Sequence, residues 1–367
     1  MSINHNELKL FLVPGVGPAN FYKIKNALQD NFSDIFSGDS DLLKSLNLPL
    51  AVLNFLTTQL DFLDAELEKE LQYIEKHQIK VISSDDVDYP ENLKNIYQPP
   101  PFLFAKGDVK KLNNKSFAIV GTRFPSDYGK DVTKNITQNL IANGITIVSG
   151  LARGIDAVAH KTALEGGETI AVIGNGFKYI YPSENRKLYE NILEENVIVS
   201  ELPFEALPDK CNFPARNRII SGLSQGVLVV EANEKSGSLI TASHAADQGK
   251  DIFAIPGEIT NPRAAGTNKL IKDGAKIVLD ANDILEELFN LPRMFEVRNK
   301  SNKEALKLLD EIDRKIFDFI DDKRTVHFEE IALSFEININ TLMSILLTLQ
   351  MKNFIKELPG KFYCIDN

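Results

Sequence analysis

The sequence contains no tryptophan, only two cysteines and no apolar run that approaches the roughly 20 residues of a membrane span. Cys211 and Cys364 lie far apart, and neither has a second cysteine nearby. This spacing excludes a CxxC metal or redox site and indicates a reducing compartment. The first residues also lack the basic-then-apolar order of a secretory signal peptide. We therefore expect a cytoplasmic protein with no membrane partner and no metal or cofactor.

Basic residues are too few for a protein that coats nucleic acid through its general charge. The chain has 41 Lys and Arg against 51 Asp and Glu, a formal net charge of -10 at pH 7. Any anion site must therefore be local, made from a few arginines and backbone N–H groups. With 367 residues, the chain is long enough for two or three domains, each with its own core.

The two ends of the chain are predicted to form smaller domains on either side of a larger central domain. Residues 1–65 predict a helical lobe similar to SAM or helix-hairpin-helix domains, with a turn at Pro14–Gly17. That turn either meets a DNA phosphate or only forms a tight corner between helices. Residues 66–114 are predicted to form a small connecting lobe, and residues 291–305 are predicted to form a linker. Residues 306–367, with three helices and a hairpin, predict a winged helix.

The centre, residues 115–290, alternates short apolar strands with helix-like segments. The candidate strands are Phe117–Val120, Ile145–Ser149, Thr169–Ile173, Val197–Ser200, Val227–Glu231, Ile252–Ile255 and Lys276–Leu279. Strict alternation predicts an α/β fold: an extended Rossmann-like, doubly wound and mostly parallel sheet. In such a sheet, ligands bind beyond the carboxyl ends of the strands.

Glycine, arginine and serine gather in the turns that follow these strands. The candidate binding residues are Gly121, Arg123, Ser149, Gly150, Arg153, Phe213, Arg216, Asn217, Arg218, Gly237 and Ser238. Glycine lets a phosphate approach the backbone, and arginine offers it a planar fork of donors. One turn arginine would favour a surface ion pair. Four in corresponding turns favour an anion site, because unpaired clustered arginines repel one another.

Other side chains near these turns leave two interpretations open. The aromatic run Phe177, Tyr179 and Tyr181 could stack bases or pack its loop onto the protein. Ser238 could cradle a phosphate or simply cap a helix. His160 could shuttle protons, but a role in helix packing is favoured, because no other metal-ligand or catalytic residue stands at a suitable spacing.

Read in order, the turn motifs form a recognisable series. They are Gly-Thr-Arg at 121–123, Ser-Gly-Leu-Ala-Arg-Gly-Ile-Asp at 149–156, Tyr-Pro-Ser-Glu-Asn at 181–185, Phe-Pro-Ala-Arg-Asn-Arg-Ile-Ile-Ser-Gly at 213–222, Gly-Ser-Leu-Ile-Thr-Ala at 237–242, Pro-Gly at 256–257 and Gly-Thr-Asn-Lys-Leu-Ile at 266–271. This series resembles the DNA processing protein A family (DprA, also called Smf) over residues 115 to 280.

The resemblance implies a usually dimeric protein that binds single-stranded DNA and has no established enzyme activity. It also implies that the protein protects incoming DNA in natural transformation and loads the RecA recombinase onto it. Arg123 matches the family's principal DNA-contacting arginine. The chain departs from the family at Ala215, where many relatives carry a basic residue, and at Asn175, where cysteine is common. The first departure would weaken DNA binding slightly.

A second functional class is a nucleotide-binding hydrolase of the phosphoribohydrolase-like Rossmann group. That group carries a Gly-Gly-x-Gly-Thr-x-x-Glu loop, whereas the corresponding loop here, residues 236–242, ends without a glutamate. Its loss removes a candidate acid or base. A third class is a transcription regulator acting through residues 306–367. The predicted third helix there has no Lys or Arg from Asn340 to Met351, which favours a structural or protein-binding role over direct reading of duplex DNA.

Overall fold

The structure, a computed structural model, describes residues 4–37, 39–289, 291, 310–335, 337–352 and 354–365. The chain divides into two compact units, Met1–Pro292 and Arg293–Asn367. The predicted linker at 291–305 lies outside the described residues, except for Leu291.

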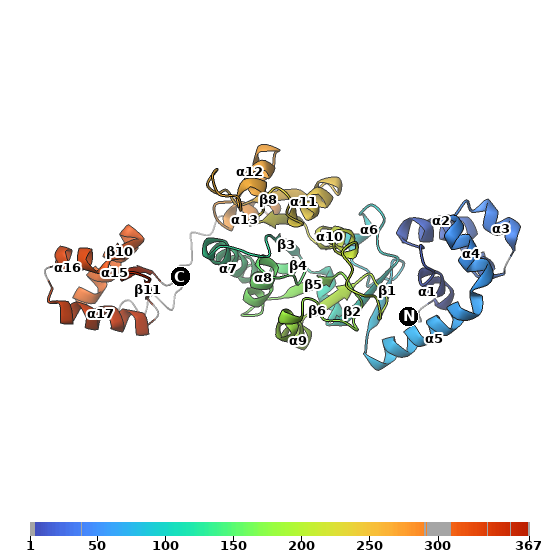
Figure 1. The fold of residues 1–367 in the computed structure, drawn as a ribbon, viewed down its shortest axis with the longest axis horizontal. Coiled ribbons are helices and arrows are strands. Elements are labelled where there is room, and N and C mark those ends of the chain that lie inside the picture. The colour runs from blue at the N-terminus through green and yellow to red at the C-terminus, as the bar shows by residue number, and fades with distance from the viewer. Residues whose placement is uncertain are drawn as a thin grey trace. The chain divides into compact units, whose positions relative to one another are not determined.

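A nine-stranded sheet forms the centre of the first unit, in the order β1-β2-β6-β5-β4-β3-β7-β8-β9 (Figure 1). Its strands are β1 (Lys80–Ser83), β2 (Phe102–Gly107), β3 (Ser116–Val120), β4 (Thr146–Ser149), β5 (Thr169–Ile173), β6 (Val197–Ser200), β7 (Gly226–Val229), β8 (Asp251–Ala254) and β9 (Lys276–Ile277). From β6 to β9 all neighbouring strands are parallel. The predicted α/β class with a mostly parallel sheet is confirmed.

Strands β1 and β2 come from residues 66–114, for which the sequence predicts a small connecting lobe. β2 pairs antiparallel with β6, and β1 pairs antiparallel with β2, so both extend the central sheet. The first four residues of β2, 102–105, are buried on both faces of the sheet. A strand with two apolar faces needs cover on each side, and the large sheet with its helices supplies that cover.

Helices cover both faces of the parallel strands. Phe117 and Ile119 of β3 pack in one core with α7 (Asp127–Ala142) and α8 (Ile155–Ala163). The alternate residues, Ala118 and Val120, pack in another core with α10 (Asn212–Leu223) and α11 (Ser238–Asp247) (Figure 1). Because successive side chains of a strand point to opposite faces, this division shows a doubly wound sheet. Helices α9 (Arg186–Glu195), α12 (Ala265–Lys272) and α13 (Asn282–Phe289) complete the layers.

The strand order changes direction between β3 and β7. From β3 the chain proceeds through β4, β5 and β6 on one side, and then crosses to β7, β8 and β9 on the other. The turns that leave β3 and β7 therefore diverge at the carboxyl ends of two neighbouring strands. This arrangement opens the crevice in which open α/β sheets bind ligands.

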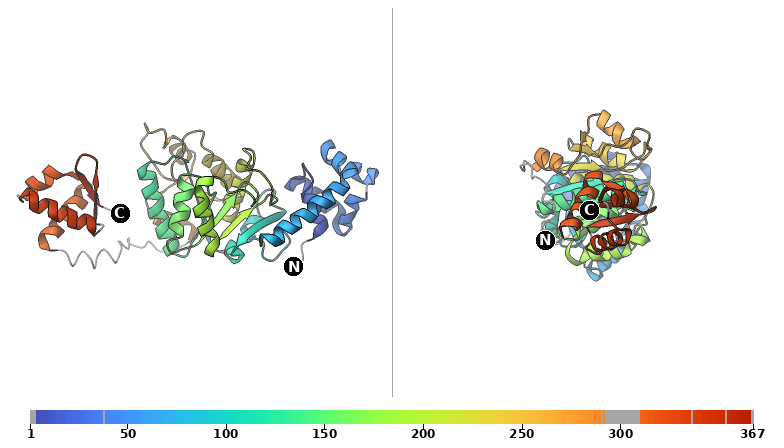
Figure 2. Two further views of the ribbon diagram at one scale, coloured as in Figure 1. Left: turned by 60° about the horizontal axis from the view of Figure 1, so that its bottom comes forward. Right: turned by 90° about the vertical axis from the view of Figure 1, so that its left-hand side faces the viewer.

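The N-terminal helices share a core with the near end of the sheet. They are α1 (His5–Phe11), α2 (Pro18–Leu28), the 3-10 helix η1 (Gln29–Phe36), α3 (Ser40–Ser45), α4 (Leu50–Thr58) and α5 (Leu60–Lys76). The rings of Phe11 and Phe21 lie edge-on to Phe102 of β2, with centroids 5.6 and 5.8 Å apart. The long helix α5 leads from these helices back to the sheet (Figure 2).

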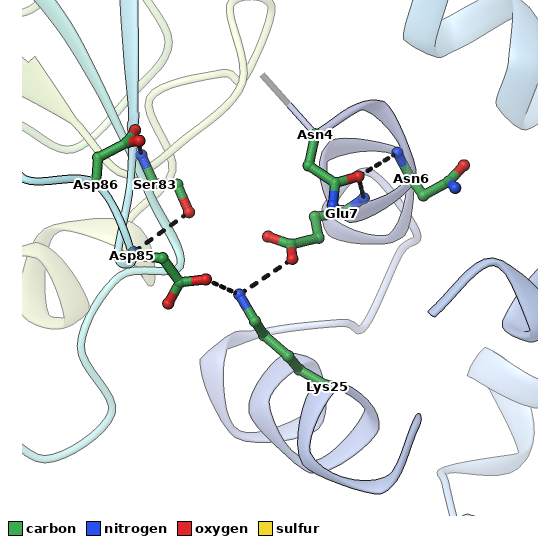
Figure 3. A network of polar contacts seen from close by, with 7 residues as sticks. All are labelled: Asn4, Asn6, Glu7, Lys25, Ser83, Asp85 and Asp86. Atoms are coloured by element: carbon green, nitrogen blue, oxygen red, sulfur yellow. Dashed lines mark hydrogen bonds and ion pairs between the residues drawn. The ribbon is translucent and has the colours of Figure 1, made fainter. Parts of the chain in front are cut away.

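A polar network joins the same helices to the turn after β1 (Figure 3). Lys25 of α2 lies between Glu7 of α1, at 3.1 Å, and Asp85, with which it forms a second ion pair. Burial lowers the pKa of Lys25, but the two carboxylates outweigh this effect and the pKa is raised. The network thus ties α1 and α2 to the sheet through a cation that stays charged.

In the residues that the structure describes, the second unit contains three helices and a small antiparallel sheet. The helices are α15 (Glu311–Lys323), α16 (Phe328–Phe335) and α17 (Ile339–Met351), and the strands β10 (Thr325–His327), β11 (Ile355–Leu358) and β12 (Phe362–Ile365) pair in the order β10-β12-β11. Within the described ranges, no single helix has the length and apolar character to cross a membrane. The bent pair formed by α16 and α17 passes that test of length and composition when taken together.

Candidate nucleic-acid interface

The turns that follow β3 and β4 contact each other at the carboxyl edge of the sheet. The Thr122 N–H donates to the Glu231 carbonyl at 2.7 Å, and the Thr122 carbonyl accepts the Ile155 N–H at 3.2 Å. Gly154 has φ +78°, and a side chain there would overlap the Thr122 carbonyl oxygen. Glycine is therefore required at this position both by its backbone conformation and by the close approach of the first turn.

Arg123 projects from the first turn into solvent. Its side chain is exposed, and within the described ranges no carboxylate or carbonyl oxygen accepts a bond from its guanidinium. The charge of Arg123 contributes to lowering the pKa of Arg216, so the two cations lie close enough to repel each other. An anion bound at Arg123 would relieve that repulsion. Of the four predicted arginines, this one is both exposed and without a partner.

Arg216, which the sequence predicts as a phosphate contact, lies beneath the turns in this structure. It is only 8% exposed, and its Nη1 donates to the Gly150 carbonyl at 2.7 Å and to the Val172 carbonyl. Ser149 is fully buried as well, and its Oγ donates to the Ile119 carbonyl at 2.7 Å. Gly150 leaves the room that the guanidinium fills. Turns at the centre of a sheet bury their backbone polar groups, and the side chains of Arg216 and Ser149 satisfy them.

Asp156 completes this buried arrangement. Its Oδ2 accepts the N–H groups of Gly150 and Ala152 at 3.0 and 3.4 Å. Burial raises the pKa of Asp156, while the nearby Arg216 opposes that rise. Burial likewise lowers the pKa of Arg216, to about 10, and Asp156 opposes that fall. Arg216 stays protonated at neutral pH, and the two residues brace the second turn from within.

His160 is a structural residue, as the sequence favoured. It is fully buried; its Nδ1 lies 2.7 Å from Thr169 Oγ1, and its Nε2 accepts the Leu151 N–H at 3.3 Å. The Thr169 hydroxyl donates to the Ile147 carbonyl, so its oxygen must accept the proton on Nδ1. Burial lowers the pKa of His160 to about 3. The ring is neutral and holds the turn in place.

The other two arginines carry acidic partners. Arg153 is half exposed and pairs with Glu184, and Arg218 is largely buried and pairs with Glu201. Burial raises the pKa of Glu201, and Arg218 counteracts this rise. Arg153 can exchange its exposed carboxylate for a phosphate at little cost, since surface ion pairs contribute at most about 1 kcal/mol. If Arg218 moved to bind a phosphate, the buried carboxylate of Glu201 would lose its partner.

The N-terminus of α11 offers backbone donors without a side-chain cap. Gly237 is exposed, and its N–H and that of Ser238 have no acceptor among the described residues. Asn217 donates from its side chain to the Gly237 carbonyl at 3.2 Å, and the hydroxyls of Ser236 and Ser238 lie 2.8 Å apart. Ser238 therefore does not cap its own helix. Asn217 contacts this loop, and the two amides lie at the positive end of the helix dipole.

Aromatic side chains stand at the far end of the same edge. The rings of Phe213 and Tyr181 have centroids 5.3 Å apart, and Tyr181 is 44% exposed. Phe213 packs over Gly174, directly after β5. Phe177, in contrast, is 8% exposed and belongs to a hydrophobic core. This residue therefore packs its loop onto the protein and is not available to stack on a base.

Three exposed residues beside Arg123 were missed from the sequence. Phe124 is 72% exposed and Tyr128 is 57% exposed. Arg263 donates from Nε to the Phe124 carbonyl at 3.3 Å, which brings a cation from the loop after β8 to the first turn. The sequence did offer one sign of an exposed aromatic residue at this site, because Phe124 directly follows a turn arginine. Nothing in the local pattern showed that Arg263, 139 residues away, would join it.

Comparisons with known proteins agree with this geometry. The family model for DNA recombination-mediator protein A matches residues 80–289. Over 225 residues the chain is 47% identical to the DNA processing protein DprA of Bacillus subtilis (strain 168), covering 61% of this chain and 76% of that protein. Over 229 residues it is 45% identical to protein Smf of Synechocystis (strain PCC 6803), covering 60% of this chain and 58% of that protein.

Two experimental structures resemble the fold. DprA from Streptococcus pneumoniae superposes with a TM-score of 0.70 and 38% identity, covering 78% of this chain and 99% of that one. DprA from Helicobacter pylori, described for its single-stranded DNA binding mode, gives a TM-score of 0.53 and 32% identity over 58% of this chain and 96% of that one. The residues that the family model matches, 80–289, include the sheet and every turn considered above. The chain belongs to the DNA recombination-mediator protein A family (DprA or Smf), whose members process DNA in recombination.

Proposed function

We propose that the protein binds single-stranded DNA along the carboxyl edge of its sheet, protects incoming DNA in natural transformation and loads RecA onto it. The observation that carries this proposal is Arg123: an exposed arginine with no partner among the described residues, in the turn at the topological switch point. Family membership and the single-stranded DNA binding of the Helicobacter relative support the same function.

The edge combines phosphate sites with stacking surfaces, as binding to single strands without strong sequence preference requires. Arg123 and the amides of Gly237 and Ser238 would hold phosphates on either side of the switch point. Phe124, Tyr128 and Tyr181 are exposed rings that bases can stack on. Arg153 would join once a phosphate displaces Glu184. Three buried residues would contribute indirectly, by holding the turn after β4 in its conformation: Arg216, Ser149 and Gly150.

We favour a non-enzymatic role over the hydrolase alternative. A hydrolase would need a free carboxylate near the crevice. Glu231, at the end of β7, is buried, and its two side-chain oxygens accept the N–H and the hydroxyl of Ser126. It caps the start of α7 through Ser126, whose Oγ accepts the Gly129 N–H at 3.0 Å. No specific observation favours base or phosphate release.

The proposed domain organisation places the DNA-binding domain at residues 115–290, the N-terminal helices at 1–65 and the C-terminal domain at 306–367. The antiparallel β10-β12-β11 sheet and the three helices support the winged-helix assignment for the C-terminal domain. A homodimer and a contact with RecA belong to the proposal through the family resemblance.

Fluorescence anisotropy with a labelled oligonucleotide tests the proposal. Arg123→Ala should weaken binding of single-stranded DNA at least tenfold, and the slope of log affinity against log salt should fall by about 0.7, the value expected for one phosphate contact on a single strand. Lys161→Ala is the matched control: it removes one exposed cation in the last turn of α8, at the opposite edge of the sheet.

The control should retain the affinity of the wild type. An Arg123→Ala variant that binds with the affinity and salt dependence of Lys161→Ala would contradict the proposed site. Equal affinity of the wild type for single-stranded and duplex DNA would contradict the single-strand preference.

A further inference from the structure

The small sheet of the second unit has an outer face that does not belong to the core of the unit. Val326, Ile355 and Tyr363 are buried, and they pack in that core with residues of α15, α16 and α17. Successive side chains of a strand alternate between the two faces of a sheet, so the neighbours of these residues point outward. In the register of the strands, the outer face consists of Thr325 and His327 of β10, Phe362 and Cys364 of β12, and Lys356 and Leu358 of β11.

An exposed aromatic ring stands on this outer face. Phe362 lies on the central strand, between His327 and Leu358, and is 40% exposed. The rings of Phe362 and His327 have centroids 4.9 Å apart and planes at 64°. The solvated face of an antiparallel sheet normally carries polar side chains. A half-exposed ring on the central strand is therefore a candidate contact for a ligand.

His327 adds a hydrogen-bond donor beside this ring. Its Nδ1 accepts the Glu329 N–H at 3.3 Å. A ring nitrogen that accepts a hydrogen bond carries no proton, so the proton of the imidazole is on Nε2. The Nε2–H group can donate to an anionic oxygen.

The charge of the small sheet is opposite to that of its unit. Residues 310–367 contain eleven Asp and Glu against seven Lys and Arg. Of these acidic residues, Glu357 alone lies in the three strands, every residue of which the structure describes, and it alternates to the other face. Lys356 lies on the outer face, Lys361 directly precedes β12, and Arg324 directly precedes β10. The outer face is thus a local basic surface on an acidic unit.

We propose that this outer face binds single-stranded DNA, as a second site that shares no residue with the carboxyl edge of the large sheet. Open sheets with exposed aromatic side chains bind single strands by stacking bases, while nearby cations hold the backbone. Phe362 would stack one base. His327 and Lys361, at the start of β12, would hold one phosphate. Lys356 and Arg324, toward the end of β12, would hold the next.

Duplex DNA fits this surface less well. A base that is paired and stacked within a duplex has no free ring face to offer to Phe362. Helix-turn-helix domains read a duplex by placing a helix in the major groove. Helix α17 has no lysine or arginine between Ile339 and Met351 with which to hold such a duplex. A single strand on the sheet face needs no helix.

Tryptophan fluorescence of the full chain tests the site, because the chain has no tryptophan of its own. Phe362→Trp keeps a ring that can stack on a base and makes it the only indole in the protein. Titration with oligothymidylate should quench its emission by about half or more as a base stacks on it. Leu347→Trp is the matched control, since Leu347 is 57% exposed on α17, which packs on the inner face of the sheet. Its emission should not change.

Removal of the cations should weaken this binding. In the Phe362→Trp chain, Lys356→Ala together with Lys361→Ala should reduce the affinity at least about fivefold, and the slope of log affinity against log salt should fall by about 1.4, or about 0.7 for each phosphate contact. Arg314→Ala is the control, because it removes an exposed cation from α15, outside the sheet. Circular dichroism verifies that each variant is folded.

Quenching of Phe362→Trp no greater than that of Leu347→Trp would overturn the proposal, and so would equal quenching by duplex DNA. Adding Arg123→Ala to the Phe362→Trp chain should leave the quenching unchanged. If the quenching were lost in that chain, the small sheet would not be a site in its own right. Failure of the proposed edge appears instead in the anisotropy of Arg123→Ala, so the two failures are distinguishable.

Discussion

Arg216 and Asp156 hold the two polar groups of the same glycine. The Gly150 carbonyl accepts from Arg216 Nη1 at 2.7 Å, and the Gly150 N–H donates to Asp156 Oδ2 at 3.0 Å. One residue comes from α10 and the other from α8, on opposite faces of the sheet. The turn after β4 is thus held by a buried cation and a buried carboxylate, each bonded to its backbone.

Arg216→Ala should destabilise the protein by about 3–5 kcal/mol, because it removes the buried cation near the Asp156 carboxylate and leaves two buried carbonyls without their donor. Arg123→Ala should change the free energy of unfolding by no more than about 0.5 kcal/mol, as is usual for an exposed residue. Denaturant unfolding compares the two variants. Wild-type stability for Arg216→Ala, together with lost DNA binding, would show that Arg216 contacts DNA directly.

Gly154→Ala should be destabilising by at least about 1–3 kcal/mol, the usual cost of a strained backbone conformation. Its methyl group would also overlap the Thr122 carbonyl and displace the turn that carries Arg123. Binding of single-stranded DNA should therefore weaken as well. Gly166→Ala is the control, since a side chain there meets no atom within 4 Å. Equal stability of the two variants, measured by thermal unfolding, would contradict the requirement for glycine.

Glu70→Gln should stabilise the protein at high pH but not at low pH. Glu70 of α5 is buried and accepts the Phe204 N–H at 2.8 Å, and burial raises its pKa from 4.5 to about 7. A carboxyl with a raised folded-state pKa costs stability once it ionises, so the cost starts above about pH 4.5 and is complete above about pH 7. Glutamine keeps a side-chain oxygen that can accept the Phe204 N–H, but it cannot ionise. The change should therefore remove a destabilisation on the order of 3 kcal/mol at high pH.

Unfolding in denaturant at pH 4.5 and at pH 8 measures this difference. Glu68→Gln is the control, because Glu68 lies on the same helix and is exposed. If Glu70→Gln raised the free energy of unfolding equally at both pH values, ionisation of the Glu70 carboxyl would not be the cause of the stabilisation.

Glu184→Gln should strengthen binding of single-stranded DNA at low salt. The change frees Arg153 from its ion pair, and the additional phosphate contact should steepen the salt dependence by about 0.7 in log–log slope. Glu194→Gln removes the same charge from an exposed position on α9 and is the control. Combining Glu184→Gln with Arg153→Ala should cancel the gain. A gain that persists in the double variant would mean that Arg153 plays no part.

Much of this protein follows from its sequence alone. Short apolar runs alternating with helical segments determine a parallel sheet covered on both faces, and β5 and β6 have the bounds that the runs predict. The sequence also predicts a ligand site at the glycines and arginines after those runs, because a parallel sheet collects the carboxyl ends of its strands at one edge.

Tertiary structure decided which arginine is available. The sequence predicts Arg123, Arg153, Arg216 and Arg218 in corresponding turns, but Arg216 and Arg218 lie within helix α10, and no local pattern separates the exposed from the buried arginines. Arg216 is buried because the turns at the sheet centre need donors for their carbonyls, and Arg218 because Glu201 lies beneath it. The place of β1 and β2 in the central sheet was not predicted either, since strand order depends on contacts between distant segments. Residue type and spacing place a group in a turn, but burial and pairing depend on what the rest of the chain brings to that turn.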